Sequence, residues 1–210
     1  MERLAKKDTV TFTDFLRARF KGVLEPIAAL LNRLGLMPNA ATLLGLFGTT
    51  IGAYFLATGQ ITIGGLIILV AAPIDALDGT MARLRGESSN FGAFVDSVTD
   101  RYSELVIFGG LLVYFLQQQN WLGAGLSYLA AAGSMLVSYI RARAQSVGFE
   151  SKVGILSRVE RFLVLIPCLI FNQPMIAVAA IAVFANFTAL QRILHVRGQA
   201  YQKMGLGSKK

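Results

Sequence analysis

The sequence predicts an all-α membrane protein, in which six transmembrane helices follow an N-terminal amphipathic surface helix. The first observation is composition, because 54% of the residues are hydrophobic and 15% are charged, whereas an ordinary soluble domain carries about 25% charged residues. The second is that charged residues are missing from positions 34–74, 105–140 and 162–191. Since a membrane helix needs about 20 apolar residues, each gap has room for most of two spans.

Polar residues inside each gap predict where the chain turns. They are residues 58–60 (TGQ), 117–120 (QQQN) and 172–174 (NQP). These turns divide the chain into six helices, which we expect at residues 40–58, 61–85, 90–117, 121–146, 155–171 and 175–195. The fifth helix begins among three charged residues, Arg158, Glu160 and Arg161.

The distribution of basic residues predicts the orientation of these helices. None of the three polar turns contains Lys or Arg; the basic residues gather in the N-terminal segment, in the connections 83–90 and 141–154, and in the C-terminal tail. The positive-inside rule then places both termini and these connections in the cytoplasm, in a prokaryotic-type cell membrane. This topology, with anionic lipid headgroups as partners, explains the net charge of +8 without nucleic-acid binding.

The chain divides into three expected segments. Residues 1–35 form a cytoplasmic amphipathic segment, because apolar residues such as Phe12 and Phe15 recur near helical spacing beside basic residues. Residues 36–197 form the six-helix transmembrane domain, and residues 198–210 form a cytoplasmic tail. The N-terminus does not resemble a cleavable signal peptide, since it lacks an apolar stretch.

Four acidic residues lie where a membrane makes charge costly. Asp75 and Asp78 stand near the end of the second predicted helix, and Asp96 and Asp100 near the facing end of the third. A charge deep in the bilayer costs about 2.5–3.5 kcal/mol, so clustered acids need a compensating partner. Spacings of three and four residues place each pair on one helical face, and the short connection 84–91 makes the two helices antiparallel neighbours.

Both pairs are therefore expected to face one small volume, where two divalent cations would neutralise them. Carboxylate oxygens favour Mg²⁺, with Mn²⁺ as the alternative, over zinc. A second interpretation is that the acids form ion pairs with Arg83, Arg85 and Arg101, although Arg101 projects about 100° away from its neighbour Asp100. A third is a cation-coupled membrane transporter, against which the acids cluster at one membrane face instead of the midplane.

Small residues accompany the acids at helical spacing. Gly79 follows Asp78, and Gly92 stands four residues before Asp96. In membrane helices such residues usually allow close packing. Beside a metal site they also admit a bulky ligand such as a nucleotide, which is the interpretation we favour here.

These residues form one pattern, Asp75-x2-Asp78-Gly79-x2-Ala82-Arg83-x8-Gly92-x3-Asp96-x3-Asp100, which resembles the signature of the CDP-alcohol phosphotransferase family at every position. The resemblance implies a homodimeric membrane enzyme in which an acceptor hydroxyl attacks the β-phosphorus of a CDP-linked donor, usually CDP-diacylglycerol, and CMP leaves. It also implies roles for individual residues. The metal ligands would be Asp75, Asp78, Asp96 and Asp100, with Asp100 as the candidate catalytic base, and the CDP moiety would be held by Asp78, Gly79, Ala82, Arg83 and Gly92.

A second set of basic residues lies beyond the acids. Arg141 ends the fourth predicted helix, Arg158 opens the fifth and Arg192 lies near the end of the sixth. Basic side chains that flank the acidic cavity would bind an acceptor that is itself a phosphate ester. Membrane anchoring is the simpler explanation for other basic residues of this region, such as Arg143.

Three short stretches resemble a narrower group, the phosphatidylinositol phosphate and archaetidylinositol phosphate synthases. They are residues 96–101 (DSVTDR), 138–144 (SYIRARA) and 158–161 (RVER). Phosphatidylglycerophosphate synthases more often have Pro and Lys where this chain has Ser97 and Arg101. The group often has Lys in place of Arg141, which preserves the charge but changes the reach.

The narrower resemblance implies that the phosphatidyl group of CDP-diacylglycerol is transferred to inositol 1-phosphate. The acceptor phosphate would be held by Ser138, Arg141, Arg158 and Arg192. Glycerol 3-phosphate, the acceptor of phosphatidylglycerophosphate synthases, is the alternative.

Overall fold

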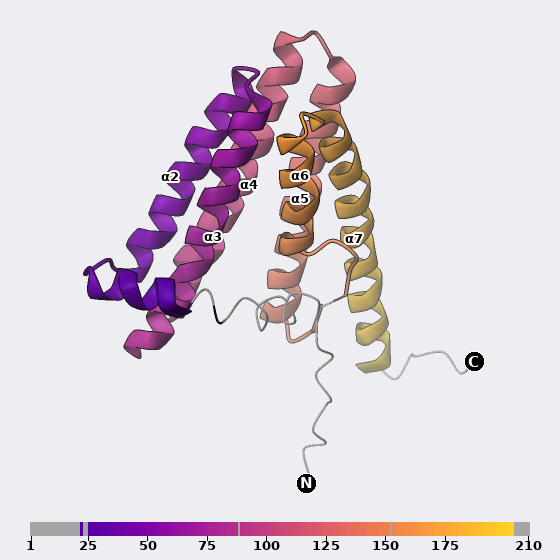
Figure 1. Ribbon diagram of the computed structural model, residues 1–210. Helices are drawn as coiled ribbons and strands as arrows, with labels where there is room; N and C mark the ends of the chain where they lie inside the picture. Colours follow the sequence, from indigo (N-terminus) through magenta and orange to yellow (C-terminus); the bar gives the residue numbers. More distant parts are fainter. Residues whose placement is uncertain (1–21, 23–24, 88, 152, 204–210) are drawn as a thin grey trace.

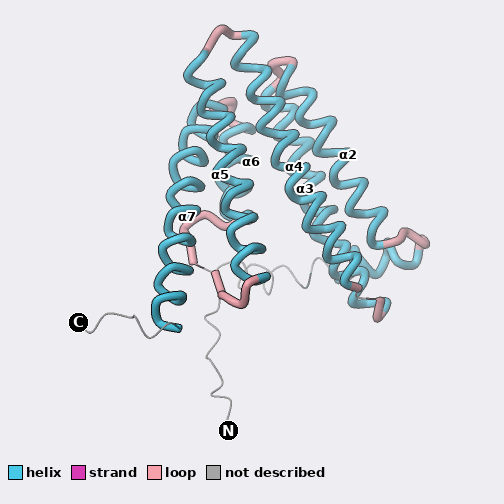
Figure 2. The backbone as a smooth tube through the Cα atoms, turned by 180° about the vertical axis from the view of Figure 1, so that it is seen from behind, coloured by secondary structure: helices cyan, strands magenta, loops and turns pink. Residues whose placement is uncertain are grey.

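The computed structural model describes residues 22, 25–87, 89–151 and 153–203, apart from the side chains of Asp75 and Ala76. Its labelled helices are α2 (Pro38–Ala57), α3 (Ile61–Arg85), α4 (Asn90–Gln117), α5 (Trp121–Ser146), α6 (Arg158–Ile170) and α7 (Pro174–Lys203). Residues 25–33 are also helical, and the described part contains no strand. Successive helices alternate in direction, with α2 to α4 on one side and α5 to α7 on the other (Figures 1 and 2).

The turns between helices stand where the polar residues predict them. Asn120 caps α5 by accepting a hydrogen bond from the backbone N–H of Gly123 at 2.9 Å, and Ser89 caps α4 through Gly92 at 3.0 Å. α3 ends at Arg85 and is followed by Gly86, whose φ of 68° is a left-handed conformation that glycine adopts readily. The predicted helix boundaries are confirmed to within one turn, except for the end of α7.

α7 continues beyond residue 195 because its last turns hold the loop between α5 and α6. The side-chain amide of Gln199 donates to the carbonyl oxygen of Glu150 at 2.5 Å. Lys203 Nζ donates to the carbonyl oxygen of Gly148 at 2.8 Å and lies 4.4 Å from the centre of the Phe149 ring. The first residues of the predicted tail are therefore helical, and residues 204–210 lie outside the described part.

Four of the described helices, α2, α3, α5 and α7, are long and apolar enough to cross a membrane. α4 does not belong to this set, and it carries Asp96, Asp100 and Glu104. α6 has only 13 residues. The predicted surface helix lies mostly outside the described residues, so it stays a prediction.

α2 packs closely against both α3 and α4, whereas α3 and α4 do not pack closely along their length. Small residues permit this arrangement. A Cβ on Gly52 of α2 would lie 2.6 Å from Ile68 Cγ1 of α3, and a Cβ on Gly110 of α4 would lie 2.5 Å from the carbonyl oxygen of Ala53. The predicted second and third helices are thus antiparallel but separated, with α2 bridging them.

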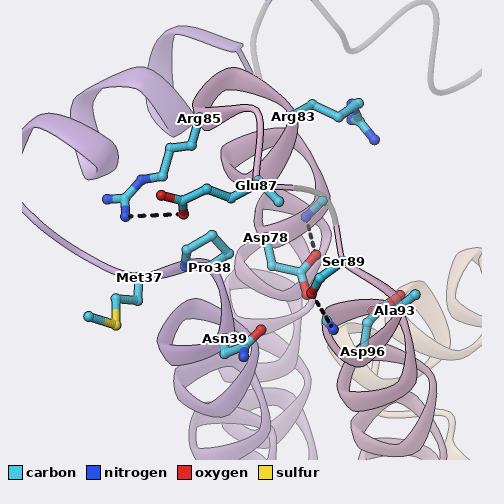
Figure 3. Close-up of a pocket in the computed structure, with 13 residues that line it drawn as sticks. Met37, Pro38, Asn39, Asp78, Arg83, Arg85, Glu87, Ser89, Ala93 and Asp96 are labelled. Carbon is cyan, nitrogen blue, oxygen red and sulfur yellow. Dashed lines mark hydrogen bonds and ion pairs between the residues drawn. The ribbon is translucent and has the colours of Figure 1, made fainter.

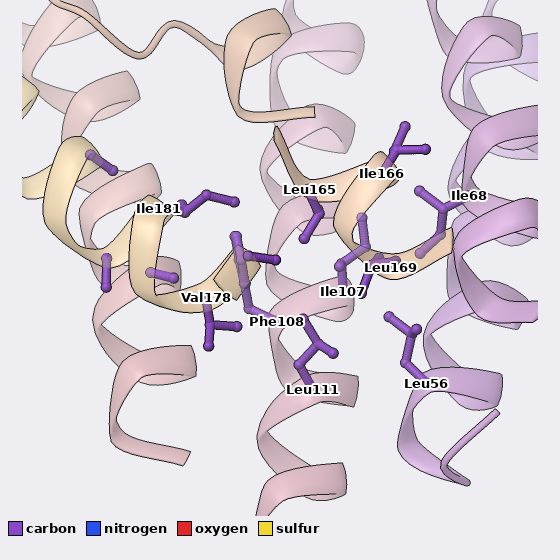
Figure 4. Close-up of a cluster of buried hydrophobic side chains, with 14 of the residues drawn as sticks. Leu56, Ile68, Ile107, Phe108, Leu111, Leu165, Ile166, Leu169, Val178 and Ile181 are labelled. Atoms are coloured by element: carbon purple, nitrogen blue, oxygen red, sulfur yellow. The ribbon is translucent and has the colours of Figure 1, made fainter. Parts of the chain in front are cut away.

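A buried hydrophobic cluster joins the two groups of helices (Figure 4). It includes Ile68 of α3, Ile107 and Leu111 of α4, and Leu165 and Leu169 of α6. In lipid such packing acts through van der Waals contact, since lipid tails are as apolar as the side chains. The cluster holds α4 between the two groups and so sets the position of the acids nearer its start.

Candidate active site

A cavity of about 540 Å³ lies between the start of α2, the end of α3 and the start of α4 (Figure 3). All residues predicted to hold the CDP moiety line it, together with a further acid of the signature: Asp78, Gly79, Ala82, Arg83, Gly92 and Asp96. Other parts of the wall come from the N-cap and first residues of α2 and from the connection between α3 and α4, including Met37, Pro38, Asn39, Glu87 and Ser89. We call this space the first cavity.

Asp78 is buried and held in a defined orientation. Thr42 Oγ1 of α2 donates to Asp78 Oδ2 at 2.5 Å, and the backbone N–H of Gly79 donates to Oδ1. The Asp78 side chain points from α3 toward Ser89 and Asp96 (Figure 3). α2 therefore orients a carboxylate that faces the start of α4.

The two arginines of the first cavity, Arg83 and Arg85, differ in their contacts. Arg83 extends away from the other lining side chains (Figure 3), and its Nη2 donates to Thr80 Oγ1 at 2.9 Å. Arg85 Nε donates to Asn32 Oδ1 and Arg85 Nη2 to the carbonyl oxygen of Leu36, both at 2.8 Å. Arg85 thus ties the segment before α2 to the end of α3, where that segment forms part of the wall.

Protein packing leaves room for a Cβ at Gly79, whereas at Gly92 a Cβ fits only if Ser89 shifts by a few tenths of an ångström. A Cβ on Gly79 would lie 3.6 Å from Arg83 Nη1, which is an ordinary contact. A Cβ on Gly92 would lie 3.3 Å from Ser89 Oγ. Gly52 differs, because a Cβ there would clash with the packed neighbouring helix.

A second cavity of about 130 Å³ lies among α4, α5, α6 and α7. All four residues predicted to hold the acceptor phosphate line it: Ser138, Arg141, Arg158 and Arg192. Arg101, Arg161, Asp100 and Glu104 line it as well. Five arginines therefore face two acids, so this cavity favours an anion.

Asp100 and Glu104 of α4 contact the first turn of α6. Arg158 Nη1 forms an ion pair with Asp100 Oδ1, and Arg158 Nε lies 3.9 Å from Glu104 Oε1. Arg161 Nη2 donates to Glu104 Oε1 at 2.6 Å. The same turn is closed by Glu160, whose carboxylate accepts a hydrogen bond from the backbone N–H of Ser157.

Arg192 shapes the second cavity as well as adding charge. Its Nη1 donates to the carbonyl oxygen of Val137 on α5 at 2.6 Å, and its Nε donates to that of Val153 in the following loop at 2.9 Å. The side chain is buried. Arg192 therefore joins α7 to α5 and to the loop that leads into α6.

The predicted acidic quartet is distributed over both cavities. Asp78 and Asp96 line the first and Asp100 lines the second, while the side chain of Asp75 lies outside the described part. Within that part, no three potential ligands of the types His, Cys, Asp and Glu gather as a metal site. The carboxylates of Asp78 and Asp96 nevertheless supply the oxygen donors that suit Mg²⁺ or Mn²⁺.

The sequence interpretation missed Glu104 and the partner of Asp100. The sequence offers Arg83, Arg85 and Arg101 as alternative partners of the acids; Asp100 lies at ion-pair distance from Arg101 but pairs more closely with Arg158. Arg101 Nη1 stands 3.9 Å from Asp100 Oδ2 and donates to the carbonyl oxygen of Ser97. Glu104 could have been found from spacing, because it continues a series of residues four apart on one face of α4: Gly92, Asp96, Asp100 and Glu104.

Comparison with known proteins identifies relatives along most of the chain. Residues 35–191 match the CDP-alcohol phosphatidyltransferase family. An archaetidylinositol phosphate synthase of Pyrococcus horikoshii is 35% identical over 184 residues, covering 87% of this chain and 95% of its own. A phosphatidylinositol phosphate synthase of Streptomyces avermitilis is 33% identical, covering 89% of this chain and 82% of its own.

Solved structures agree with these relatives. The crystal structure of Mycobacterium tuberculosis phosphatidylinositol phosphate synthase with CDP-DAG bound superimposes with a TM-score of 0.77 at 29% identity, covering 83% of this chain and 93% of that one. The structure of the same enzyme with manganese and citrate gives a TM-score of 0.78, covering 83% and 88%. From the matched signature, the extent of the match and the shared fold, the chain belongs to the CDP-alcohol phosphatidyltransferase family.

Proposed function

We propose that this enzyme transfers a phosphatidyl group from CDP-diacylglycerol to inositol 1-phosphate and releases CMP. The observation that carries the proposal is the placement of an arginine-lined cavity beside the cavity of the family signature, along one face of α4. Asp96 and Asp100 are one helical turn apart, a rise of about 6 Å. A donor in the first cavity and an acceptor in the second would therefore come together between Asp96 and Asp100.

Three observations support the first cavity as the donor site. The signature residues line it, glycines at 79 and 92 leave its side clear, and it is large enough for part of a nucleotide. A homologous enzyme was solved with CDP-DAG bound. Arg83, whose guanidinium fork suits two phosphate oxygens, would turn toward the donor.

The charge of the second cavity supports a phosphorylated acceptor. Five arginines against two acids leave an excess of positive charge, which a phosphate dianion would balance. Relatives named as archaetidylinositol phosphate and phosphatidylinositol phosphate synthases favour inositol 1-phosphate. Glycerol 3-phosphate presents the same dianion and is the competing acceptor.

The chemistry requires one bond to form and one to break. The acceptor hydroxyl oxygen bonds to the donor β-phosphorus, the bond from that phosphorus to the CMP oxygen breaks, and Asp100 takes the hydroxyl proton. Two divalent cations, Mg²⁺ or Mn²⁺ as in the homologous manganese structure, would supply charge neutralisation of the pyrophosphate. Asp75, Asp78, Asp96 and Asp100 would hold them.

The membrane arrangement belongs to the same proposal. All six helices of residues 36–197 would lie in the bilayer, with the amphipathic segment on its surface. The ends that carry both cavities and both chain termini would face the cytoplasm, where the basic residues of the connections gather. Like other family members, the enzyme would work as a homodimer.

A panel of acceptors tests the proposal. Purified protein receives CDP-diacylglycerol and Mg²⁺ in detergent micelles, with inositol 1-phosphate, glycerol 3-phosphate or free inositol, and CMP release is measured. We expect the highest kcat/KM with inositol 1-phosphate and no acceptor-dependent release with free inositol. A higher kcat/KM with glycerol 3-phosphate would identify that compound as the acceptor instead. CMP release that depends on none of the three compounds would refute the transfer reaction.

A further inference from the structure

Arg158 contacts both acids of the second cavity. Its Nη1 pairs with Asp100 Oδ1, its Nε lies 3.9 Å from Glu104 Oε1, and its guanidinium lies 5.3 Å from the centre of the Phe162 ring. The side chains of Asp100 and Arg158 are 16% and 32% exposed. This partial shielding from water strengthens the ion pair relative to one on an open surface.

The contact with Arg158 engages one of the two carboxylate oxygens through which Asp100 could act as the base. A general base accepts a proton through a carboxylate oxygen placed about 2.6–3.2 Å from the hydroxyl. Asp100 Oδ1 is bound to Arg158, and Arg101 Nη1 stands 3.9 Å from Oδ2. While Arg158 contacts Oδ1, its guanidinium competes with water and with an acceptor hydroxyl for this oxygen, and its positive charge weakens the carboxylate as a base.

A phosphate ester offers Arg158 a stronger partner than Asp100. A guanidinium binds two phosphate oxygens through parallel hydrogen bonds, and a phosphate monoester carries more negative charge than one carboxylate. Arg141 and Arg192 line the same cavity and attract the same dianion. A phosphate that enters the second cavity would therefore draw Arg158 away from Asp100.

We propose that Arg158 makes the enzyme selective for a phosphorylated acceptor over water, because it holds Asp100 until an acceptor phosphate displaces it. Arg158 is then a specificity-determining residue, and this inference rests on the proposed function. The reaction it suppresses is hydrolysis of the donor. In that reaction a water oxygen bonds to the β-phosphorus, one water proton passes to Asp100, and the bond to CMP breaks, giving CMP and phosphatidic acid.

Methyl phosphate tests the inference on the unaltered protein, because it carries the dianion but no hydroxyl. Formation of phosphatidic acid and CMP from CDP-diacylglycerol is measured in micelles with Mg²⁺ and no acceptor. Adding methyl phosphate should raise hydrolysis by at least about tenfold, since an engaged general base contributes about 10²–10⁴-fold to a rate. A fall in hydrolysis, or no change, overturns the proposal.

Two matched variants separate the ion pair from the charge of the cavity. Arg158→Gln should hydrolyse the donor faster than the unaltered protein and respond no further to methyl phosphate. Arg141→Gln removes the same charge from the same cavity but leaves the Arg158–Asp100 pair intact, so it should lose acceptor-dependent transfer without a gain in hydrolysis. Equal hydrolysis in the two variants contradicts the inference.

Mn²⁺ binding gives a readout apart from turnover. With neither donor nor acceptor present, paramagnetic resonance titration should show tighter Mn²⁺ binding in Arg158→Gln than in Arg141→Gln, because Asp100 is released as a ligand only in the former. Equal affinities would count against the inference. Thermal unfolding in detergent confirms that both variants fold, and the methyl phosphate experiment stands without them.

The inference and the proposed function fail in different ways. If the unaltered protein releases no CMP with any phosphorylated polyol, the proposed function is wrong. If it transfers to inositol 1-phosphate normally while methyl phosphate leaves hydrolysis unchanged, only the role assigned to Arg158 is wrong.

Discussion

Arg161 of α6 and Glu104 of α4 form a buried ion pair, with 2.6 Å between Nη2 and Oε1. Their exposed fractions are 2% and 5%. Arg161 Nη1 also donates to the carbonyl oxygen of Leu156 at 3.2 Å. The pair joins the start of α6 to α4 beside the second cavity, so it holds the turn that carries Arg158.

Removing Glu104 should destabilise the protein strongly. Glu104→Leu leaves the charge of Arg161 buried without its partner, which typically costs about 3–5 kcal/mol. Thermal unfolding in detergent measures the loss. Glu87→Leu is the matched control, because Glu87 is exposed and 3.9 Å from Arg85, and such surface pairs contribute about 0–1 kcal/mol. Similar losses in both variants would contradict the importance of burial.

Thr42 should matter for catalysis through Asp78. Thr42→Val removes the hydroxyl that donates to Asp78 Oδ2, and loss of such an orienting partner of a metal ligand typically costs about 10–100-fold in affinity or activity. Steady-state kinetics at varied Mg²⁺ measure the effect. Thr50→Val is the control on the same helix, since Thr50 donates only locally, to the carbonyl oxygen of Leu46. Equal activity in the two variants would show that Thr42 does not orient Asp78.

Gly154 should be required for acceptor binding. Its φ is 135°, and a Cβ there would lie 2.3 Å from Thr188 Cγ2, so Gly154→Ala pushes the loop before α6 away from α7. We expect the KM for the acceptor to rise by about tenfold, equivalent to about 1.4 kcal/mol, with a smaller change for the donor. Gly148→Ala is the control, because Gly148 also has a positive φ, of 78°, but has open space around it. An equal rise in KM in this variant would show that backbone strain alone causes the loss.

The two cavities should respond to different substrates. Arg83→Ala is expected to raise the KM for CDP-diacylglycerol, and Arg141→Ala to raise the KM for the phosphorylated acceptor, because they line different cavities. Loss of one phosphate contact to a charged group is worth about 1.5–3 kcal/mol, or about 10–100-fold. Two-substrate initial-rate kinetics separate the effects. Equal changes in both KM values for either variant would refute the division.

Asp96 should be required for the metal-dependent activity. Chelation with EDTA is expected to abolish CMP release by the unaltered protein, and added Mg²⁺ or Mn²⁺ to restore it. Asp96→Asn removes one charged oxygen donor and should stay inactive at the same metal concentrations. CMP release by this variant at the level of the unaltered protein would exclude Asp96 as a ligand.

Most of the helical layout could be predicted because long uncharged stretches are interrupted only at turns. The polar residues at 58–60, 117–120 and 172–174 mark the loops, and the helices begin and end close to them. The separation of α3 from α4 could not be predicted, since it depends on α2 packing against both through Gly52 and its neighbours. The extension of α7 depends on contacts of Gln199 and Lys203 with a loop distant in sequence.

Many of the residues that line the two cavities could be predicted from the sequence, but the contacts between them could not. The signature spacing identifies residues that line the first cavity, and the basic residues at helix ends identify residues that line the second. Asp100, which the spacing grouped with the other acids, lines the second cavity instead. The pairing of Asp100 with Arg158 was not predictable, because it requires α6 to begin beside α4. Glu104 was not predicted as a site residue, because a single acid next to an uncharged stretch is most simply read as the end of a membrane span. Its position four residues after Asp100 would have placed it on the same face of α4.

Among the described elements, α4 alone lines both cavities. The other residues of the first cavity precede α4 in the chain and those of the second follow it, so each half of the sequence builds one cavity together with α4. If the first cavity binds the donor and the second the acceptor, as proposed, then substitutions after α4 would alter acceptor choice without touching the residues that line the donor cavity. The helix between the two cavities acts as a spacer of constant pitch, and inserting one residue between Asp96 and Asp100 would rotate the two cavities apart by about 100°.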